Sequence, residues 1–388
     1  MKSCLVLLLI CISSNSLMSQ PYYLSKRSMF ECPKVAKSAS VAFVGFMQNQ
    51  QFDSAQIVLK NWTQKCGICE PILRANVILA IATNRPIDSF INEENMRLIY
   101  DYQRRGRIIE NRSAEDNSIY QWNWGYVPIG MEFDSFTISY FREIKVRKQD
   151  NSLEYLLSSI YSNTNDDMYI ALQKQEYKET SLAKEYYKLV NKYINKPDFN
   201  MAFLAGIWIP TGGIAKLGLH PDVGVQLGSK YRKVSIDMTI MFKFGNSPNP
   251  YYATRVRSDK STVLTDNFFG AYMGIDVGKD IWRKNNKELQ MLFGAGVDGF
   301  DALEADTIRN LKAESTWTYN INTGIGYRYY INNWTYVGMR VKYNIVDYAL
   351  NGVINFNGHP ITLTFCIGGL SNKNKRHGLE YLKYSWKR

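Results

Sequence analysis

Residues 335–348, TYVGMRVKYNIVDY, decide the fold because their character alternates at every step. One set of alternate positions is apolar and consists of Val337, Met339, Val341, Tyr343 and Ile345. The positions between them are Tyr336, Gly338, Arg340, Lys342 and Asn344. Successive side chains of a β-strand point to opposite faces, so this period of two predicts a strand with one apolar face. Whether the apolar face contacts lipid or the interior of the protein then decides the class of protein.

Seven other segments of the C-terminal half alternate in the same way. They lie at residues 201–209, 223–227, 234–244, 269–277, 289–297, 319–329 and 361–367. In each segment one set of positions is strongly apolar, and the other is rich in glycine, hydroxyl, amide or charged side chains. We therefore predict an eight-stranded antiparallel β-barrel over residues 198–371.

The volume of such a barrel indicates which face points outward. A soluble eight-stranded barrel of the lipocalin type, a ligand carrier, would turn its large apolar side chains inward. Eight strands enclose an interior only just wide enough for side chains. Six sets of Phe, Met and Tyr would overfill it, whereas glycine, Ser, Thr and paired charges would fit. We therefore expect the apolar face to point outward, into lipid.

The lengths of the connections give independent support. The second, fourth and sixth connections, SKYRK, WRKNNK and INNW, are short and polar, and the other four are longer. Outer-membrane barrels alternate short periplasmic turns with long external loops. An even number of strands then places both ends of the barrel in the periplasm.

On these features the chain resembles small outer-membrane β-barrels of the OmpA-like transmembrane-domain kind, over residues 198–371. A helical domain in front of such a barrel is similar to the architecture of Bacteroidota envelope proteins. The resemblance rests on pattern and topology. It implies a location in the cell outer membrane, with a helical domain at 20–196 and a basic tail at 372–388 both in the periplasm.

The first residues, MKSCLVLLLICISSNSLMSQ, have the pattern of a secretory signal peptide over residues 1–19. A lipoprotein signal that uses Cys11 is the alternative, although LLIC lacks the small residues expected before such a cysteine. The apolar run is too short for a transmembrane helix.

The formal net charge is +12, which is compatible with nucleic-acid binding or with an anionic membrane surface. The basic excess lies in the tail and in scattered turns rather than on one helix, so we predict no nucleic-acid partner. The 27 Tyr and 8 Trp suit a barrel with aromatic girdles at the membrane interfaces.

The N-terminal half is predicted to be helical because its apolar spacing approaches 3.6 residues. Expected helices are 34–49, 53–65 with Asp53 as N-cap, 70–83 with Pro71 in the first turn, 89–105, 152–162, 167–175 and 181–194. The rhythm of residues 34–84 is similar to one tetratricopeptide unit. Stacked helices of this kind often bind a protein, and we expect an envelope protein partner here.

Three cysteines of this half are disulfide candidates, namely Cys32, Cys66 and Cys69. The spacing Cys66-Gly-Ile-Cys69 is also that of a thioredoxin-like redox motif, but the flanking sequence is helical rather than strand followed by helix. We expect a structural bridge from Cys32 to Cys66 or to Cys69, and the spacing does not decide between them.

Charged residues occupy the inward positions of the predicted barrel. They are Asp237, Lys243, Asp276, Asp298, Arg328, Arg340 and Lys342. Because buried charges need partners and both signs are present, we predict an ion-pair network that closes the lumen to ions. A functional site is the alternative interpretation.

The three histidines, His220, His359 and His377, lack metal-ligand spacing, and no known catalytic motif is present. We therefore predict no cofactor, no metal and no enzymatic activity. The predicted function is that of an outer-membrane protein whose helical domain anchors or binds an envelope partner. The alternative is a lipid or peptide hydrolase that uses His220 or His359 at the barrel rim.

Overall fold

The computed structural model describes residues 26–111, 125–164 and 167–386, and the chain forms two compact units, Met1–Leu189 and Val190–Arg388. The predicted signal peptide at 1–19 and the lipoprotein alternative at Cys11 lie outside the described residues. Within the described parts, no helix combines the length and the apolar composition needed to cross a membrane.

The first unit consists of helices. They are α2 (Lys26–Gln48), α3 (Phe52–Cys66), α4 (Glu70–Ala82), α5 (Glu93–Asn111), α7 (Glu132–Arg147), α8 (Leu153–Tyr161) and the short α9 (Met168–Ala171), with 3-10 turns η1 (Asp88–Phe90) and η3 (Gln175–Tyr177). Helix α10 (Ser181–Ile194) begins in this unit and ends in the second one.

Helix α4 is the centre of the helical unit. Ten of its 13 residues are buried, and eight of these ten are apolar, so the helix is surrounded by protein on most of its sides. It packs between α3 and α5, and further contacts join α2 to α7 and α5 to α8. These contacts give the unit a hydrophobic core of its own. The tetratricopeptide-like character predicted for residues 34–84 is not shown.

Most of the predicted helices are present, with three corrections. Asp53 is not an N-cap, because α3 already begins at Phe52 and Gln51 occupies the cap position. The helix expected over 167–175 is reduced to the four residues of α9. Helix α7 was not predicted, since Phe, Thr, Ile, Tyr and Val in this segment weaken any helical pattern. Pro71 does stand in the first turn of α4.

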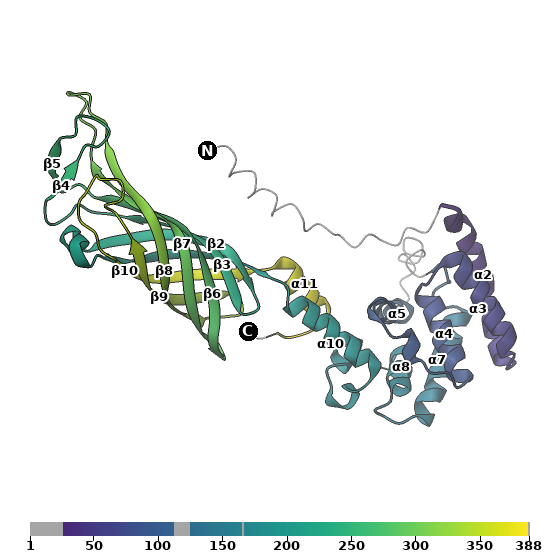
Figure 1. The fold of residues 1–388 in the computed structure, drawn as a ribbon. Coiled ribbons are helices and arrows are strands. Elements are labelled where there is room, and N and C mark those ends of the chain that lie inside the picture. Colours follow the sequence, from purple (N-terminus) through teal and green to yellow (C-terminus); the bar gives the residue numbers. More distant parts are fainter. Residues whose placement is uncertain (1–25, 112–124, 165–166, 387–388) are drawn as a thin grey trace. The chain divides into compact units, whose positions relative to one another are not determined.

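The second unit contains a closed antiparallel barrel of eight strands, as predicted (Figure 1). The strands are β1 (Asp198–Ile209), β2 (His220–Tyr231), β3 (Val234–Lys243), β6 (Phe269–Lys284), β7 (Lys287–Leu303), β8 (Glu314–Tyr330), β9 (Thr335–Val346) and β10 (Ile361–Ser371). Neighbours in the sequence pair with each other, and β1 pairs with β10 to close the barrel.

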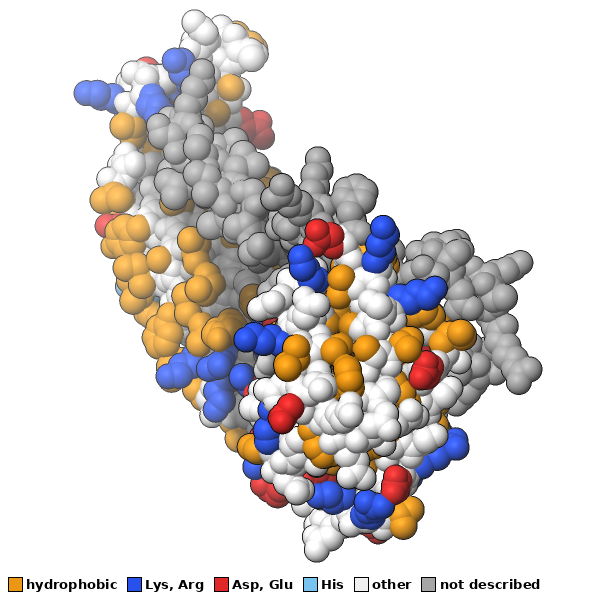
Figure 2. Space-filling model, turned by 90° about the vertical axis from the view of Figure 1, so that its right-hand side faces the viewer, with side chains coloured by type: hydrophobic (Ala, Val, Ile, Leu, Met, Phe, Trp, Pro, Cys, Tyr) orange, Lys and Arg blue, Asp and Glu red, His pale blue; other side chains and the backbone are white. Residues whose placement is uncertain are grey.

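The apolar set of each strand faces outward. Phe242, Phe293 and Phe365 on three different strands are 41%, 53% and 57% exposed, whereas Asp237 and Arg328 on the opposite face are 2% and 1% exposed. Figure 2 shows the result as a broad apolar surface along the barrel wall. A carrier with an apolar cavity is therefore wrong for this chain.

The connections differ in length at the two ends of the barrel. Only residues 232–233, 285–286 and 331–334 separate the strands at the turn end. The long connections contain the 3-10 helix η4 (Gly212–Leu217) and a small hairpin of β4 (Tyr251–Thr254) with β5 (Thr262–Thr265), which was not predicted. Trp208, Phe300 and Tyr348 join with loop residues in an apolar cluster that covers this end.

The C-terminal tail is partly helical. Helix α11 (Lys373–Tyr381) follows β10 after one residue, Asn372, whose side-chain oxygen accepts the Lys375 N–H at 2.9 Å and caps the helix. Nζ of Lys375 lies 3.1 Å from a carboxylate oxygen of Asp198, and both residues are buried. The segment predicted as a basic tail is thus partly helical, and one of its lysines is buried in an ion pair.

Candidate functional site

The interior of the barrel is the candidate site, since it holds the charged residues singled out in the sequence. Its middle layer contains Lys342 on β9 and Asp276 on β6, with Nζ and Oδ1 2.6 Å apart. The hydroxyl of Thr239 donates to the other oxygen of Asp276 at 2.7 Å. Arg340 donates to Oε1 of Gln226 at 2.5 Å. Side chains from four strands thus meet across the lumen.

The layer near the long loops contains Lys243 on β3 and Asp298 on β7, which form a short ion pair. Asn320 donates to the second carboxylate oxygen of Asp298 at 3.1 Å. A cavity of about 40 Å³ lies between these two layers, with Asp222 and Tyr272 also in its lining. A space of this size has room for only a few water molecules.

The layer near the short turns holds the largest cluster. Nζ of Lys230 lies 2.8 Å from Asp280 and 2.7 Å from Glu288. The guanidinium of Arg328 lies 3.7 Å from both Glu288 and Asp237, and 4.7 Å above the ring of Tyr336. All these side chains are buried. The cluster thus occupies the interior at the turn end of the barrel.

The structure brings six of the seven predicted lumen residues together in three ion pairs, Lys243–Asp298, Lys342–Asp276 and Arg328–Asp237. Arg340 instead hydrogen-bonds the neutral Gln226. Sequence reasoning missed Lys230, Asp280 and Glu288, which had been assigned to turns or left out of the network. The signal was present, because each continues the inward parity of its strand by one or two further steps.

Such an arrangement has a clear physical consequence. A charge withdrawn from water is costly unless it is paired and hydrogen-bonded, and here both signs are held within contact distance on a rigid wall. An ion that crosses the barrel would have to break these pairs. The interior of the barrel is therefore occupied by paired charges at all three levels described above.

The two histidines of the hydrolase alternative lie near the long loops but differ in surroundings. His220 is buried, its ring nitrogens face the carbonyl oxygens of Phe244 and Leu217 at 3.1 and 2.9 Å, and its ring stacks on Phe268 at 3.7 Å. His359 is half-buried and accepts the Val346 N–H at Nδ1. His377 is exposed on α11. Both ring nitrogens of His220 are thus directed to backbone carbonyl oxygens.

The helical unit contains a second buried charge cluster that the sequence did not reveal. Arg74 on α4 and Arg105 on α5 both lie 2.9 Å from Oδ1 of Asp134 on α7. Glu70 lies 2.9 Å from Arg74, one helical turn away. Burial raises the pKa of Glu70, whereas at Asp134 the two guanidiniums outweigh burial and lower the pKa of the carboxyl. The pairs tie three helices together.

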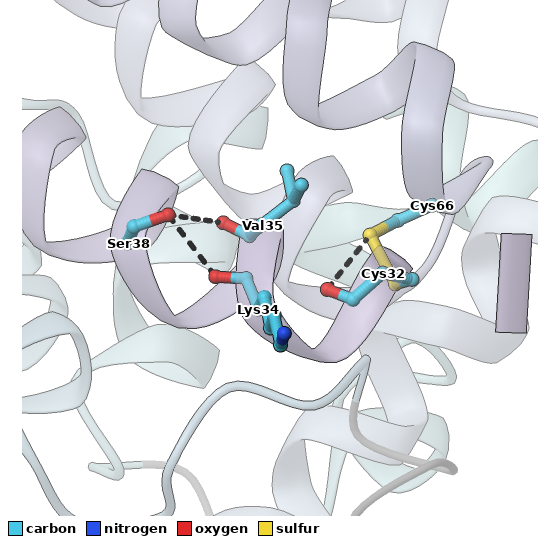
Figure 3. The surroundings of a disulfide bond; sticks show 5 residues. All are labelled: Cys32, Lys34, Val35, Ser38 and Cys66. Carbon is cyan, nitrogen blue, oxygen red and sulfur yellow. Dashed lines mark hydrogen bonds between the residues drawn. A yellow bond between two sulfur atoms is a disulfide. The ribbon is translucent and has the colours of Figure 1, made fainter. Parts of the chain in front are cut away.

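The disulfide prediction is resolved in favour of Cys32 and Cys66. These residues join α2 to α3 with their Cα atoms 5.0 Å apart (Figure 3). Cys69 keeps a free thiol, and burial raises its pKa to about 12. The CxxC spacing therefore joins one bridged and one unbridged cysteine, which does not fit a thioredoxin-like redox pair.

Comparison with known proteins shows a likeness to solved outer-membrane proteins over part of the chain. No family model matches the chain, and no curated protein matches it. Among solved structures, Neisserial surface protein A is 9% identical over 45% of this chain and 98% of its own, with a TM-score of 0.34. The N-terminal β-barrel domain of Pseudomonas aeruginosa OprF, also 9% identical, has a TM-score of 0.27 over 45% and 100%. The outer membrane protease OmpT of Escherichia coli, again 9% identical, has a TM-score of 0.21 over 45% and 94%.

Proposed function

We propose that this chain is a non-enzymatic outer-membrane protein whose barrel spans the bilayer as a closed anchor and whose helical unit binds an envelope protein in the periplasm. The observation that carries the proposal is the distribution of side chains in the barrel wall. Large apolar groups face outward on all eight strands, and paired charges fill the interior.

The outward face favours lipid over water. Phe203, Ile275 and Phe365, which lie on three different strands, are 63%, 57% and 57% exposed. A soluble protein rarely exposes an apolar surface that surrounds the whole molecule. In lipid the same wall is stable, because every strand is paired and the closed barrel has no free edge.

The two ends of the barrel indicate its orientation. Short turns face the periplasm in bacterial outer-membrane barrels, and long loops face outward. The chain enters β1 at Asp198 and leaves β10 at Ser371, both at the turn end. With this orientation, the helical unit and α11 lie on the periplasmic side.

The helical unit is the part suited to binding. Its own core, the buried Arg74–Asp134 pair and the Cys32–Cys66 bridge hold a fixed surface, and a stable bridge also suits the oxidising periplasm. Apolar side chains remain on this surface, among them Ile57 at 70% and Val146 at 87% exposure. Because the barrel is filled, we assign the interaction to this unit.

Photocrosslinking in intact envelopes tests the proposal. A photoreactive amino acid at Ile57 or Val146 is expected to capture a discrete protein partner, which mass spectrometry can identify. The same probe at Phe293, on the outer wall of the barrel, is the matched control and is expected to capture lipid. Absence of protein adducts at both helical positions, with the Phe293 probe still labelling lipid, would contradict the binding role of the helical unit. It would leave the membrane assignment of the barrel intact.

A further inference from the structure

The outer wall of the barrel has a hollow at the turn end, between β1, β10 and β9. Gly369 on β10 stands there between Met201 on β1 and Thr335 on β9. A Cβ atom on Gly369 would meet only one atom within 4 Å, the Trp334 carbonyl oxygen at 3.5 Å. Gly369 is thus one open part of a larger groove of about 580 Å³, a volume within the range of ligand pockets.

Large apolar side chains form the walls of this groove. Phe203 and Ile367 pair directly across β1 and β10 in the next outward row, and they are 63% and 64% exposed. Phe199 lies on the other side of Met201 along β1. The groove is therefore an apolar channel that opens on the wall assigned above to hydrocarbon.

Two cations border the end of the groove. Lys373 and Arg376 are exposed in the first turn of α11, three residues apart, and both line the groove. Neither forms an ion pair with a carboxylate of the described residues, in contrast to the buried Lys375 between them. The two positive charges are thus available to an anion.

The position of these cations is fixed by the packing of α11. Asn372 donates from Nδ2 to the carbonyl oxygen of Pro197 at 2.6 Å. Nζ of Lys375 lies 3.1 Å from a carboxylate oxygen of Asp198, the first residue of β1. Gly378 lies against the ring of Tyr193, where a Cβ atom would approach ring carbons to 2.2 Å. Helix α11 is therefore held at three points, to Asp198 of β1, to Pro197 just before it and to Tyr193 of α10, which keeps Lys373 and Arg376 beside the groove.

We propose that this groove binds an anionic phospholipid of the periplasmic leaflet. One acyl chain lies in the hollow over Gly369, and the phosphate lies between Lys373 and Arg376. An apolar channel that ends in unpaired cations matches a molecule with a hydrocarbon tail and an anionic head group. Trp334 at the same rim suits the interface between hydrocarbon and head groups. The inference rests on the membrane orientation given under the proposed function.

Lipid titration followed by native mass spectrometry tests this site. The full chain, folded in detergent, is mixed with phosphatidylglycerol or with phosphatidylcholine of the same acyl chains. We expect one phosphatidylglycerol to remain bound at least tenfold more tightly than phosphatidylcholine. The double variant K373E/R376E is expected to abolish this preference, and Gly369→Leu to weaken retention of both lipids. Lys284→Glu, an exposed lysine at another turn, is the control and is expected to change neither.

Heat-modifiable gel mobility of each variant shows that the barrel is folded, so loss of binding is not confused with unfolding. Equal retention of the two lipids by the native chain would overturn the proposal. Unchanged preference in K373E/R376E would overturn it as well. A native chain that shows no heat-modifiable mobility in any lipid would instead overturn the membrane assignment on which the site rests.

Discussion

Nζ of Lys342 and Oδ1 of Asp276 lie 2.6 Å apart in the middle of the barrel, on strands that are not neighbours in the sheet. The pair therefore spans the bore rather than running along the wall. Both side chains are at most 10% exposed. The pair thus links two separated strands across the interior of the barrel.

Removal of one member of this pair is expected to destabilise the barrel strongly. Lys342→Met leaves the Asp276 carboxylate buried without its cation, which costs about 3–5 kcal/mol. The double variant K342M/D276L removes both charges and should be markedly more stable than Lys342→Met. The temperature at which the fast-migrating folded band disappears on a gel measures the effect. Lys284→Met at an exposed turn should leave that temperature unchanged.

The filled interior predicts a barrel that does not conduct. With three layers of paired charges and a cavity of only about 40 Å³ between two of them, we expect no continuous water path. In planar bilayers the reconstituted chain should give no steady channel openings, whereas a porin in the same bilayer serves as the positive control. Large, stable single-channel conductance of the native chain would refute a lumen closed by ion pairs.

An arginine on the outer wall should impair folding into the membrane. Phe293 is 53% exposed near the middle of β7, so Phe293→Arg places a charge at the depth of the hydrocarbon. The expected cost is about 2–4 kcal/mol in the free energy of folding into lipid vesicles. Ile331→Arg, in the turn between β8 and β9, is the matched control and should cost at most about 1 kcal/mol. Equal effects at the two positions would argue against a lipid-facing wall.

The barrel could be predicted from the sequence because apolar and polar positions alternate clearly along its long strands. The pattern at Val337, Met339 and Val341 recurs on the seven other strands, and the barrel of eight closes where β1 pairs with β10. The ends of the strands were harder to predict, since Lys230 was assigned to the turn SKYRK and Asp280 was left out of the predicted strand. The structure shows that the paired strands extend to the two-residue turns, which places both residues at inward positions.

The helical unit was less predictable for a different reason. Arg74, Arg105 and Asp134 come from three separate helices, and a sequence read one helix at a time gives no sign that they meet. The choice of Cys66 over Cys69 also depended on three-dimensional placement. Cys66 faces Cys32 across α2 and α3, whereas the sulfur of Cys69 lies against Gly125.

The buried cluster of the helical unit predicts sensitivity to acid. The pKa of Asp134 is lower in the folded state, because Arg105 and Arg74 favour its charged form despite burial. Its stabilising contribution is thus complete above the unfolded pKa, about 3.9, and is lost as pH falls through the folded value. Asp134→Asn should lose about 3–5 kcal/mol at pH 7. Hydrogen exchange of peptides from α4 and α7 in the full chain would show this loss as faster exchange, and unchanged exchange would contradict it.

The free thiol of Cys69 should react slowly in the native protein. Burial raises its pKa to about 12, so at pH 8 only about one thiol in 10,000 is a thiolate. Alkylation by iodoacetamide should be roughly a thousand-fold slower than for an unperturbed cysteine, and should rise with pH up to the folded pKa. Peptide mapping should find Cys32 linked to Cys66. A link that involves Cys69 would contradict the assignment.

The most direct test of the account is the environment of the outer wall. Single nitroxide labels at positions 242, 293 and 365 can be introduced in a C4S/C11S/C69S/C366A background, which keeps the Cys32–Cys66 bridge. In lipid vesicles, paramagnetic resonance should show frequent collisions of all three labels with oxygen and few with a water-soluble nickel complex. A label at Ile308, in a loop and 95% exposed, should show the reverse. Labels at the three Phe positions that collide with neither reagent, or mainly with nickel, would contradict a barrel whose apolar wall meets lipid.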